Sequence, residues 1–185
     1  MRHTLVIHPR TPEPAVREIT ARVSRPSRAV LTVAFSLGGA LARLRIPEAG
    51  PARPGRDLWR HTCFEAFVAR ADASAYHEIN VAPSGAWTVY AFRGYRDGGP
   101  LEDASLAPRA RVRCEADRLV LDATIDLARL ASDYPHAPLR VGLAVVVETA
   151  DGTLSYWALR HPPGAPDFHH ADAFAIALEA PTEAC

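Results

Sequence analysis

Lysine is absent from this chain, so all 21 basic residues are arginine, and 21 acidic residues balance them. A formal net charge of zero gives no electrostatic reason to expect an acidic macromolecular partner. Nucleic acids and anionic membranes attract proteins largely through clustered positive charge. We therefore expect neither as a partner, and the sequence leaves any protein partner undefined.

Cysteine is scarce as well, and no long apolar run is present. The three cysteines, Cys63, Cys114 and Cys185, are too few and odd in number for the disulfide framework of a small secreted domain. No run approaches the roughly 20 apolar residues of a transmembrane helix. The apolar run near the N-terminus is also too short for a signal peptide. These absences predict a cytoplasmic protein.

Helical periodicity is rare too, whereas alternation of apolar with other residues recurs along the chain, as in Leu31–Leu37. About ten short strands are expected, at Leu31–Leu37, Leu41–Ile46, Cys63–Arg70, Tyr76–Ala82, Trp87–Arg93, Arg109–Glu115, Leu119–Asp126, Leu139–Glu148, Leu154–Leu159 and Phe174–Leu178. One short helical piece, Leu127–Ser132, follows the candidate capping residue Asp126, and the segment 12–27 fits either a helix or a strand. The pattern predicts an all-β fold, a β-sandwich or a barrel, as one domain over residues 1–185 with its core at roughly 30–178.

Two of the expected strands place polar side chains on one face. A four-residue loop at 71–74 would pair the strands so that Glu65 lies opposite Asn80 and Phe67 lies opposite Glu78. Glu65, Glu78 and Asn80 would then share a face, while the apolar residues between them point to the core. This face is either a solvated surface or a polar binding platform.

The next turn, Pro83-Ser84-Gly85, suits a type I turn with a left-handed glycine. A three-residue loop places Thr88, Tyr90 and Phe92 on the face of Glu78. A four-residue loop places Trp87, Val89 and Arg93 there instead, because a slip of one residue exchanges the two faces of a strand. The sequence leaves this choice open.

The segments Leu58–Phe67, Tyr76–Gly85 and Tyr95–Gly98 resemble the bacterial DOMON-like domains, and so do Trp157–Leu159 and His161–Gly164. The resemblance spans roughly residues 30–178. The fold of that group is similar to the family 9 carbohydrate-binding modules. The resemblance implies an antiparallel β-sandwich of jelly-roll type that holds a sugar or a haem.

In the family 9 modules two tryptophans sandwich the sugar and a glutamate reaches its hydroxyl groups. The resemblance assigns these roles here to Trp59, Trp157 and Glu65. Further partners for the sugar hydroxyls are Glu78, Asn80, Arg93 and Arg96. The expected function is therefore binding of a small molecule, a carbohydrate above all, without catalysis and without a cofactor.

The sequence is also compatible with three other functions. A haem could be held by two histidines of the set His61, His77, His161, His169 and His170, because the only methionine is Met1. Glu65 and Glu78, at a diagonal backbone separation of roughly 7–8 Å, could be the carboxylate pair of a glycoside hydrolase. The chain could also be a scaffold without a ligand. A metal site is not expected, and its weak candidates are His161, Asp167 and His169.

Overall fold

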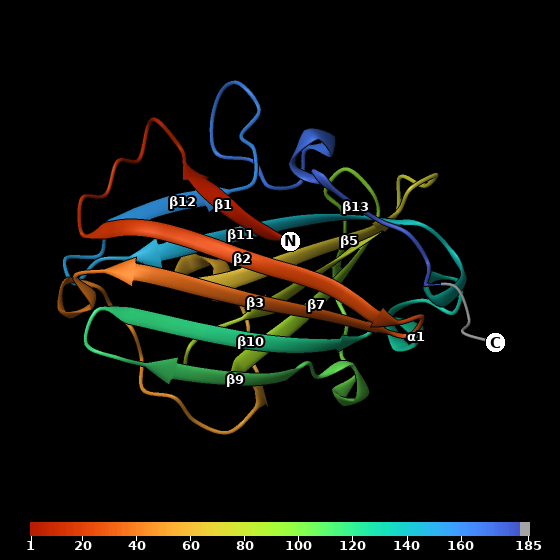
Figure 1. The fold of residues 1–185 in the computed structure, drawn as a ribbon, viewed down its shortest axis with the longest axis horizontal. Helices are drawn as coiled ribbons and strands as arrows, with labels where there is room; N and C mark the ends of the chain where they lie inside the picture. Colours follow the sequence, from red (N-terminus) through yellow and green to blue (C-terminus); the bar gives the residue numbers. More distant parts are fainter. Residues whose placement is uncertain (182–185) are drawn as a thin grey trace.

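The computed structural model describes residues 1–181, so Cys185 lies outside the described residues. Its strands are β1 (Arg2–Ile7), β2 (Val16–Ser27), β3 (Val30–Gly39), β4 (Arg53–Pro54), β5 (Cys63–Arg70), β6 (Tyr76–Val81), β7 (Ala86–Gly94), β8 (Asp97–Pro100), β9 (Arg109–Cys114), β10 (Arg118–Asp126), β11 (Leu139–Glu148), β12 (Leu154–Ala158) and β13 (Ile176–Leu178). The prediction of an all-β fold is confirmed (Figure 1).

Helical structure is limited to short turns. The α-helix α1 (Leu127–Leu130) begins where expected, because the Asp126 carboxylate accepts hydrogen bonds from the N–H groups of Ala128 and Arg129. The 3₁₀ turns are η1 (Leu41–Arg43), η2 (Leu58–Arg60), η3 (Ala104–Leu106), η4 (Tyr134–His136) and η5 (Ala171–Ala173). No helix of residues 1–181 is long and apolar enough to cross a membrane.

The strands form one hydrogen-bonded path, in the order β4-β7-β6-β5-β11-β12-β1-β2-β3-β10-β9. β13 pairs with β11, and β8 pairs with β7. The short strand β1 joins the two halves of this path. Its first residues pair with β2, as Leu5 does with Ile19, whereas Val6 and Ile7 pair with β12. The pairing is antiparallel apart from the two-residue parallel contact of β4 with β7.

The two halves of the sheet face each other across the main hydrophobic core. Figure 1 shows β2, β3 and β10 crossing in front of β5 and β7. The rings of Phe35 on β3 and Phe64 on β5 lie 5.3 Å apart. A second, smaller core covers the opposite face of β5, β6, β11 and β12, where Phe174 packs on Phe67 and Tyr76, and Phe168 packs on Tyr156. The returning segment before β13 thus closes over the outer face of the sheet.

Two local predictions differ from the structure. The segment Leu41–Ile46 is not a strand paired with its predecessor, because η1 begins there and β3 pairs with β2 and β10 instead. The stretch 94–108, which lies between two expected strands and was predicted to contain none, includes the strand β8. The segment 12–27, which the sequence left open, forms the long strand β2 from Val16 onward.

Candidate functional site

The outer face of β5, β6 and β7 carries the polar side chains that the sequence placed together. Glu65 lies opposite Asn80, and Phe67 lies opposite Glu78, so the predicted register is confirmed. The next register pairs Glu78 with Tyr90. Because directly opposed residues of antiparallel strands project to the same side, one face holds two carboxyl groups and an amide beside an aromatic ring.

The turn between β6 and β7 resolves the choice of loop length. Pro83, Ser84 and Gly85 form a three-residue loop, closed by a hydrogen bond from the N–H of Gly85 to the carbonyl of Ala82. Gly85 has φ +82°, a left-handed conformation that favours glycine. Thr88, Tyr90 and Phe92 therefore lie on the face of Glu78, and Trp87 points into the main core.

A cleft of about 520 Å³ opens on this face. It lies between the strands β7 and β8 and the segment Pro166–His169, which comes from the far end of the chain. Its lining includes the aromatic side chains Trp59, Tyr90, Phe92, Tyr156 and Phe168 and the polar side chains Glu65, Glu78, Arg96 and His169. A ligand in the cleft would therefore meet aromatic rings together with carboxyl groups.

The two carboxyl groups are nearly inaccessible to bulk water. Glu65 is 2% exposed and Glu78 is 5% exposed. Burial, reinforced by the charge of Glu78, raises the pKa of Glu65 well above its usual range. Burial raises the pKa of Glu78 to about 7, although a hydrogen bond from Asn80 and the charge of Arg96 act in the opposite direction. Both carboxyl groups therefore keep a proton to a higher pH than a solvent-exposed glutamate does.

Two buried oxygen atoms of this group lack a hydrogen-bond partner within the described residues. They are Oε1 of Glu65 and Oδ1 of Asn80. The Nδ2 group of Asn80 donates to Oε1 of Glu78 at 2.7 Å, which fixes the orientation of the amide. A buried acceptor without a partner costs roughly 1–3 kcal/mol. A ligand that donates hydrogen bonds would recover part of this cost.

His169 and Tyr76 form a second polar layer beside Glu78. The Tyr76 hydroxyl accepts the N–H of Arg96 at 3.2 Å and lies 2.8 Å from Nδ1 of His169. When the hydroxyl donates to Nδ1, the neutral ring carries its hydrogen on Nε2, which lies 3.7 Å from Oε2 of Glu78. Burial and the charge of Arg96 lower the pKa of His169 to about 4, so the ring is neutral at neutral pH.

Asp167 joins the two walls of the cleft. Its carboxylate accepts hydrogen bonds from Arg96 at 2.9 Å and from the Tyr95 hydroxyl at 2.8 Å. Tyr95 and Arg96 form the turn between β7 and β8, where Arg96 adopts the left-handed φ of +55°. Asp167 therefore holds the turn against the segment that follows β12. The guanidinium of Arg96 lines the cleft but is already paired.

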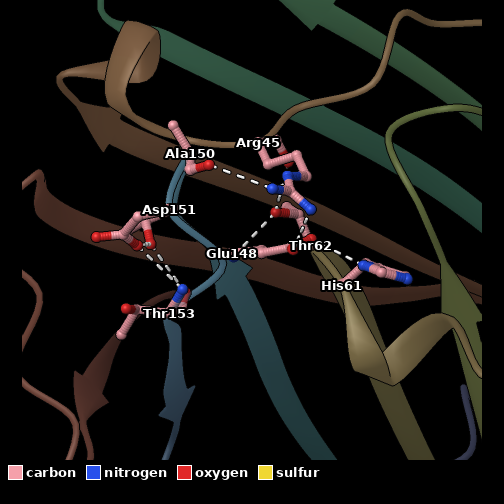
Figure 2. Close-up of polar contacts among 8 residues, drawn as sticks. Arg45, His61, Thr62, Glu148, Ala150, Asp151 and Thr153 are labelled. Carbon is pink, nitrogen blue, oxygen red and sulfur yellow. Dashed lines mark hydrogen bonds and ion pairs between the residues drawn. The ribbon is translucent and has the colours of Figure 1, made fainter.

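Trp59 lies at the rim of the cleft on the turn η2 and is 43% exposed. The residue after this turn, His61, contacts the buried carboxylate of Glu148 at the end of β11, at 2.8 Å. Arg45 contacts the other oxygen of the same carboxylate at 2.8 Å, and Figure 2 shows Glu148 between the two. Glu148 therefore fixes the position of η2, and with it Trp59, relative to the sheet.

Trp157 and Arg93 do not lie in the cleft, contrary to the sequence-based assignment. Trp157 is 6% exposed and belongs to the main core, where its Nε1 group donates to the Ser155 hydroxyl. It lies opposite Val145, which itself lies opposite Phe64, so all three point inward. The side chain of Arg93 is 85% exposed and pairs with Asp97. Asn80 lies beneath the cleft, in contact with Glu78.

The aromatic ring that β12 presents to the cleft is that of Tyr156, one residue before Trp157. The alternation of side chains along the strands places Tyr156 on this face. Tyr156 pairs with Val146, and Val146 pairs with Cys63, which lies on the same face as Glu65. The sequence analysis did not place Phe168 in the site, because no local sequence pattern shows that its loop folds back over the sheet. The three-residue alternative for the turn at 83–85 predicted Tyr90 and Phe92 on this face.

The histidines considered for haem or metal binding are engaged separately. Nε2 of His161 lies 2.9 Å from the carbonyl of Val6, and its ring packs on that of His8. His77 contacts the Tyr134 hydroxyl. Among residues 1–181, no group of three histidine, cysteine or acidic side chains could hold a metal ion. Asp167 and His169 instead belong to the wall of the cleft. Haem binding stays a prediction.

Two solved structures share this fold. A Bacteroides uniformis protein with a provisional assignment as carbohydrate-binding superposes with a TM-score of 0.71, at 13% identity, over 94% of this chain and 83% of its own. A family 9 carbohydrate-binding module from Caldicellulosiruptor kristjanssonii, solved with cellotriose, superposes with a TM-score of 0.53, at 11% identity, over 89% of this chain and 74% of its own. No protein-family model and no curated protein matches the sequence.

Proposed function

We propose that this chain is a jelly-roll-type β-sandwich of the DOMON-like and family 9 type that binds a small carbohydrate without transforming it. The observation that carries the proposal is the cleft, which combines aromatic walls with buried polar groups that have unused hydrogen-bonding capacity. A pyranose has apolar faces and a rim of hydroxyl groups. Aromatic rings cover the faces, and carboxyl and amide groups bind the rim. The likeness to a module solved with cellotriose supports the same ligand class.

The proposal includes the expectations that follow from composition. The partner is a small molecule and not a nucleic acid or a membrane, the protein acts in the cytoplasm, and binding needs no cofactor. These parts rest on the balanced charge and the sparse cysteines of the sequence.

Titration calorimetry with a panel of neutral mono- and oligosaccharides tests the proposal. For a disaccharide, about 0.3 kcal/mol per heavy atom sets a Kd of about a micromolar or weaker. Trp59→Ala is expected to weaken binding about tenfold, since it removes a ring at the rim of the cleft. Arg93→Ala is the control, because Arg93 lies outside the cleft, and it should leave the affinity unchanged. Absence of heat with every sugar, or equal effects of both variants, would contradict the proposal.

A second candidate function is glycoside hydrolysis by Glu65 and Glu78, favoured by the raised pKa of each carboxyl group in a cleft. A retaining or inverting mechanism needs one protonated and one ionised carboxyl group. Incubation with aryl glycosides and detection of the released phenol tests it. Release that Glu78→Gln abolishes would establish this function in place of simple binding.

A further inference from the structure

The floor of the cleft holds two buried carboxyl groups and no cation that neutralises them. Among residues 1–181, no arginine forms an ion pair with Glu65 or Glu78, and the chain has no lysine. Arg96 lines the cleft, but Asp167 holds its guanidinium at 2.9 Å. The ring of His169 lies 3.7 Å from Glu78 and is neutral at neutral pH. Below about pH 7 the carboxyl group of Glu78 is held neutral by a proton, and a cationic group of a ligand could take the place of that proton.

At the floor of the cleft, hydrogen-bond acceptors rather than donors are left without partners among residues 1–181. The unpartnered buried atoms are both oxygen atoms: Oε1 of Glu65, whose residue lines the cleft, and Oδ1 of Asn80, which lies beneath it. When ionised, a carboxylate only accepts hydrogen bonds, and the amide oxygen of Asn80 does the same. The complementary ligand group is thus a donor with several N–H bonds.

The walls favour positive charge as well. The rings of Tyr90, Phe92 and Tyr156 line the same cleft, and the ring of Trp59 at its rim already holds the Arg60 guanidinium at 4.9 Å. The faces of aromatic rings attract cations, and more strongly where water is excluded. A sugar that carries a cationic group would therefore gain at both the floor and the walls.

We propose that the carbohydrate bound in this cleft is an amino sugar with a free primary amine, whose ammonium group lies against Glu65 and Glu78. This inference rests on the proposed function and names its ligand class. A primary ammonium provides three hydrogen-bond donors and one positive charge, which matches Oε1 of Glu65 and the carboxyl groups that have no ion-pair partner among the described residues. A quaternary ammonium has no donor for Oε1 of Glu65. An N-acetylated amine has one donor and no charge.

A comparison of three sugars of the same size tests the ligand class. Calorimetry with glucosamine, glucose and N-acetylglucosamine at about pH 6, where a free amine is cationic, is expected to give at least about tenfold tighter binding of glucosamine. Equal affinities for glucosamine and glucose would overturn the inference and leave the proposed function standing. Binding of methylammonium with no binding of any sugar would overturn the proposed function. No binding of any compound would overturn both.

Proton release is a second measurement, and it needs no variant. An ammonium group beside Glu78 stabilises the ionised carboxylate, so binding expels a proton into the buffer. The other titratable groups that face the two glutamates are Cys63, Tyr76, Tyr90, Arg96, Asp167 and His169. Because of the shifts in their pKa values, none of these six groups changes its charge near pH 6. The binding heat of glucosamine should therefore depend on the ionisation enthalpy of the buffer, whereas that of glucose should not.

Glu78→Gln removes the charge and keeps an oxygen that can accept from Asn80. It should weaken glucosamine binding about tenfold and glucose binding by less, because only the amino sugar loses an ion pair. Glu18→Gln is the matched control, because it removes the same charge on β2, in the other half of the sheet. Circular dichroism shows whether Glu78→Gln is folded. Equal loss for both sugars, or an equal loss of glucosamine affinity in Glu18→Gln, would contradict recognition of the ammonium by Glu78.

Discussion

At the scale of single residues, Tyr156 and Trp157 show how one strand serves two faces of the sheet. Tyr156 lines the cleft, and its ring centroid lies 6.1 Å from that of Phe168. Trp157 lies in the main core, between the two halves of the sheet. A change of one position along β12 therefore separates a residue that lines the cleft from a residue that stabilises the fold.

Paired substitutions test this division. Trp157→Ala should lower the free energy of unfolding by about 3–5 kcal/mol, because it leaves a cavity in the core. Tyr156→Ala should cost only about 1 kcal/mol but weaken sugar binding. Urea denaturation followed by circular dichroism gives the stabilities, and calorimetry gives the affinities. A Trp157→Ala protein with normal stability and reduced affinity would show that the faces are assigned the wrong way round.

Glu78 also connects the cleft to the stability of the fold. Its pKa is about 7 in the folded protein, against an ordinary value of 4.5. Between these pH values the folded state keeps a proton that the unfolded chain has lost. Stability contributed by this group is therefore present below about pH 4.5 and is lost as the pH rises to about 7.

Glu78→Gln should abolish this loss, since glutamine does not ionise. The stability of the variant relative to the parent should rise from about pH 4.5 to 7.5 by up to about 3 kcal/mol. The lowered pKa of His169 acts in the opposite direction, with stability rising up to about pH 6.5, but it is present in both proteins. Urea melts at several pH values give the difference. A difference that stays constant with pH would contradict the raised pKa of Glu78.

At the scale of elements, the narrow hairpin of β7 and β8 forms one wall of the cleft. Gly98 on β8 lies so close to β7 that an added Cβ would be 1.9 Å from the carbonyl oxygen of Ala91. Gly99, the next residue, would place a Cβ in open space. Only the first glycine is required for the strands to approach, and both Gly99 and Pro100 line the cleft beyond it.

Alanine at each glycine tests the role of this approach. Gly98→Ala should cost about 2 kcal/mol and weaken sugar binding, because β8 must move away from β7. Gly99→Ala is the matched control and should cost less than about 1 kcal/mol. Thermal melts and calorimetry measure both effects. Equal destabilisation by the two substitutions would show that the close contact does not determine the wall.

At the scale of the whole molecule, the main core includes side chains from both halves of the sheet, and β1 pairs with both halves. Neither half has a separate core on its inner face. A chain built in this way should unfold in one cooperative transition.

Urea titrations with different probes test this cooperativity. Backbone circular dichroism, tryptophan fluorescence and near-ultraviolet circular dichroism should give one coincident midpoint. The tryptophans report on different places, because Trp59 lies at the rim of the cleft while Trp87 and Trp157 lie in the core. Two separated transitions would contradict the single domain expected over residues 1–185.

The sequence by itself determined the features that depend on neighbouring residues. Alternation gave most of the strands, turn chemistry gave Gly85 its left-handed conformation, and a short loop fixed Glu65 opposite Asn80. These features are local, because a strand has a period of two and a tight turn sets the register of the strands that it joins.

The tertiary structure decided what depends on strands that are distant in the sequence. The resemblance assigned Trp157 to the cleft, but the pairing of β11 with β5 sets which face of β12 points outward, and no local pattern encodes that parity. Likewise, only the fold-back of the segment Pro166–His169 over the sheet brings Phe168 and His169 to Glu78. The cleft thus combines a floor that the sequence predicted with a wall supplied by burial of apolar side chains on the outer face.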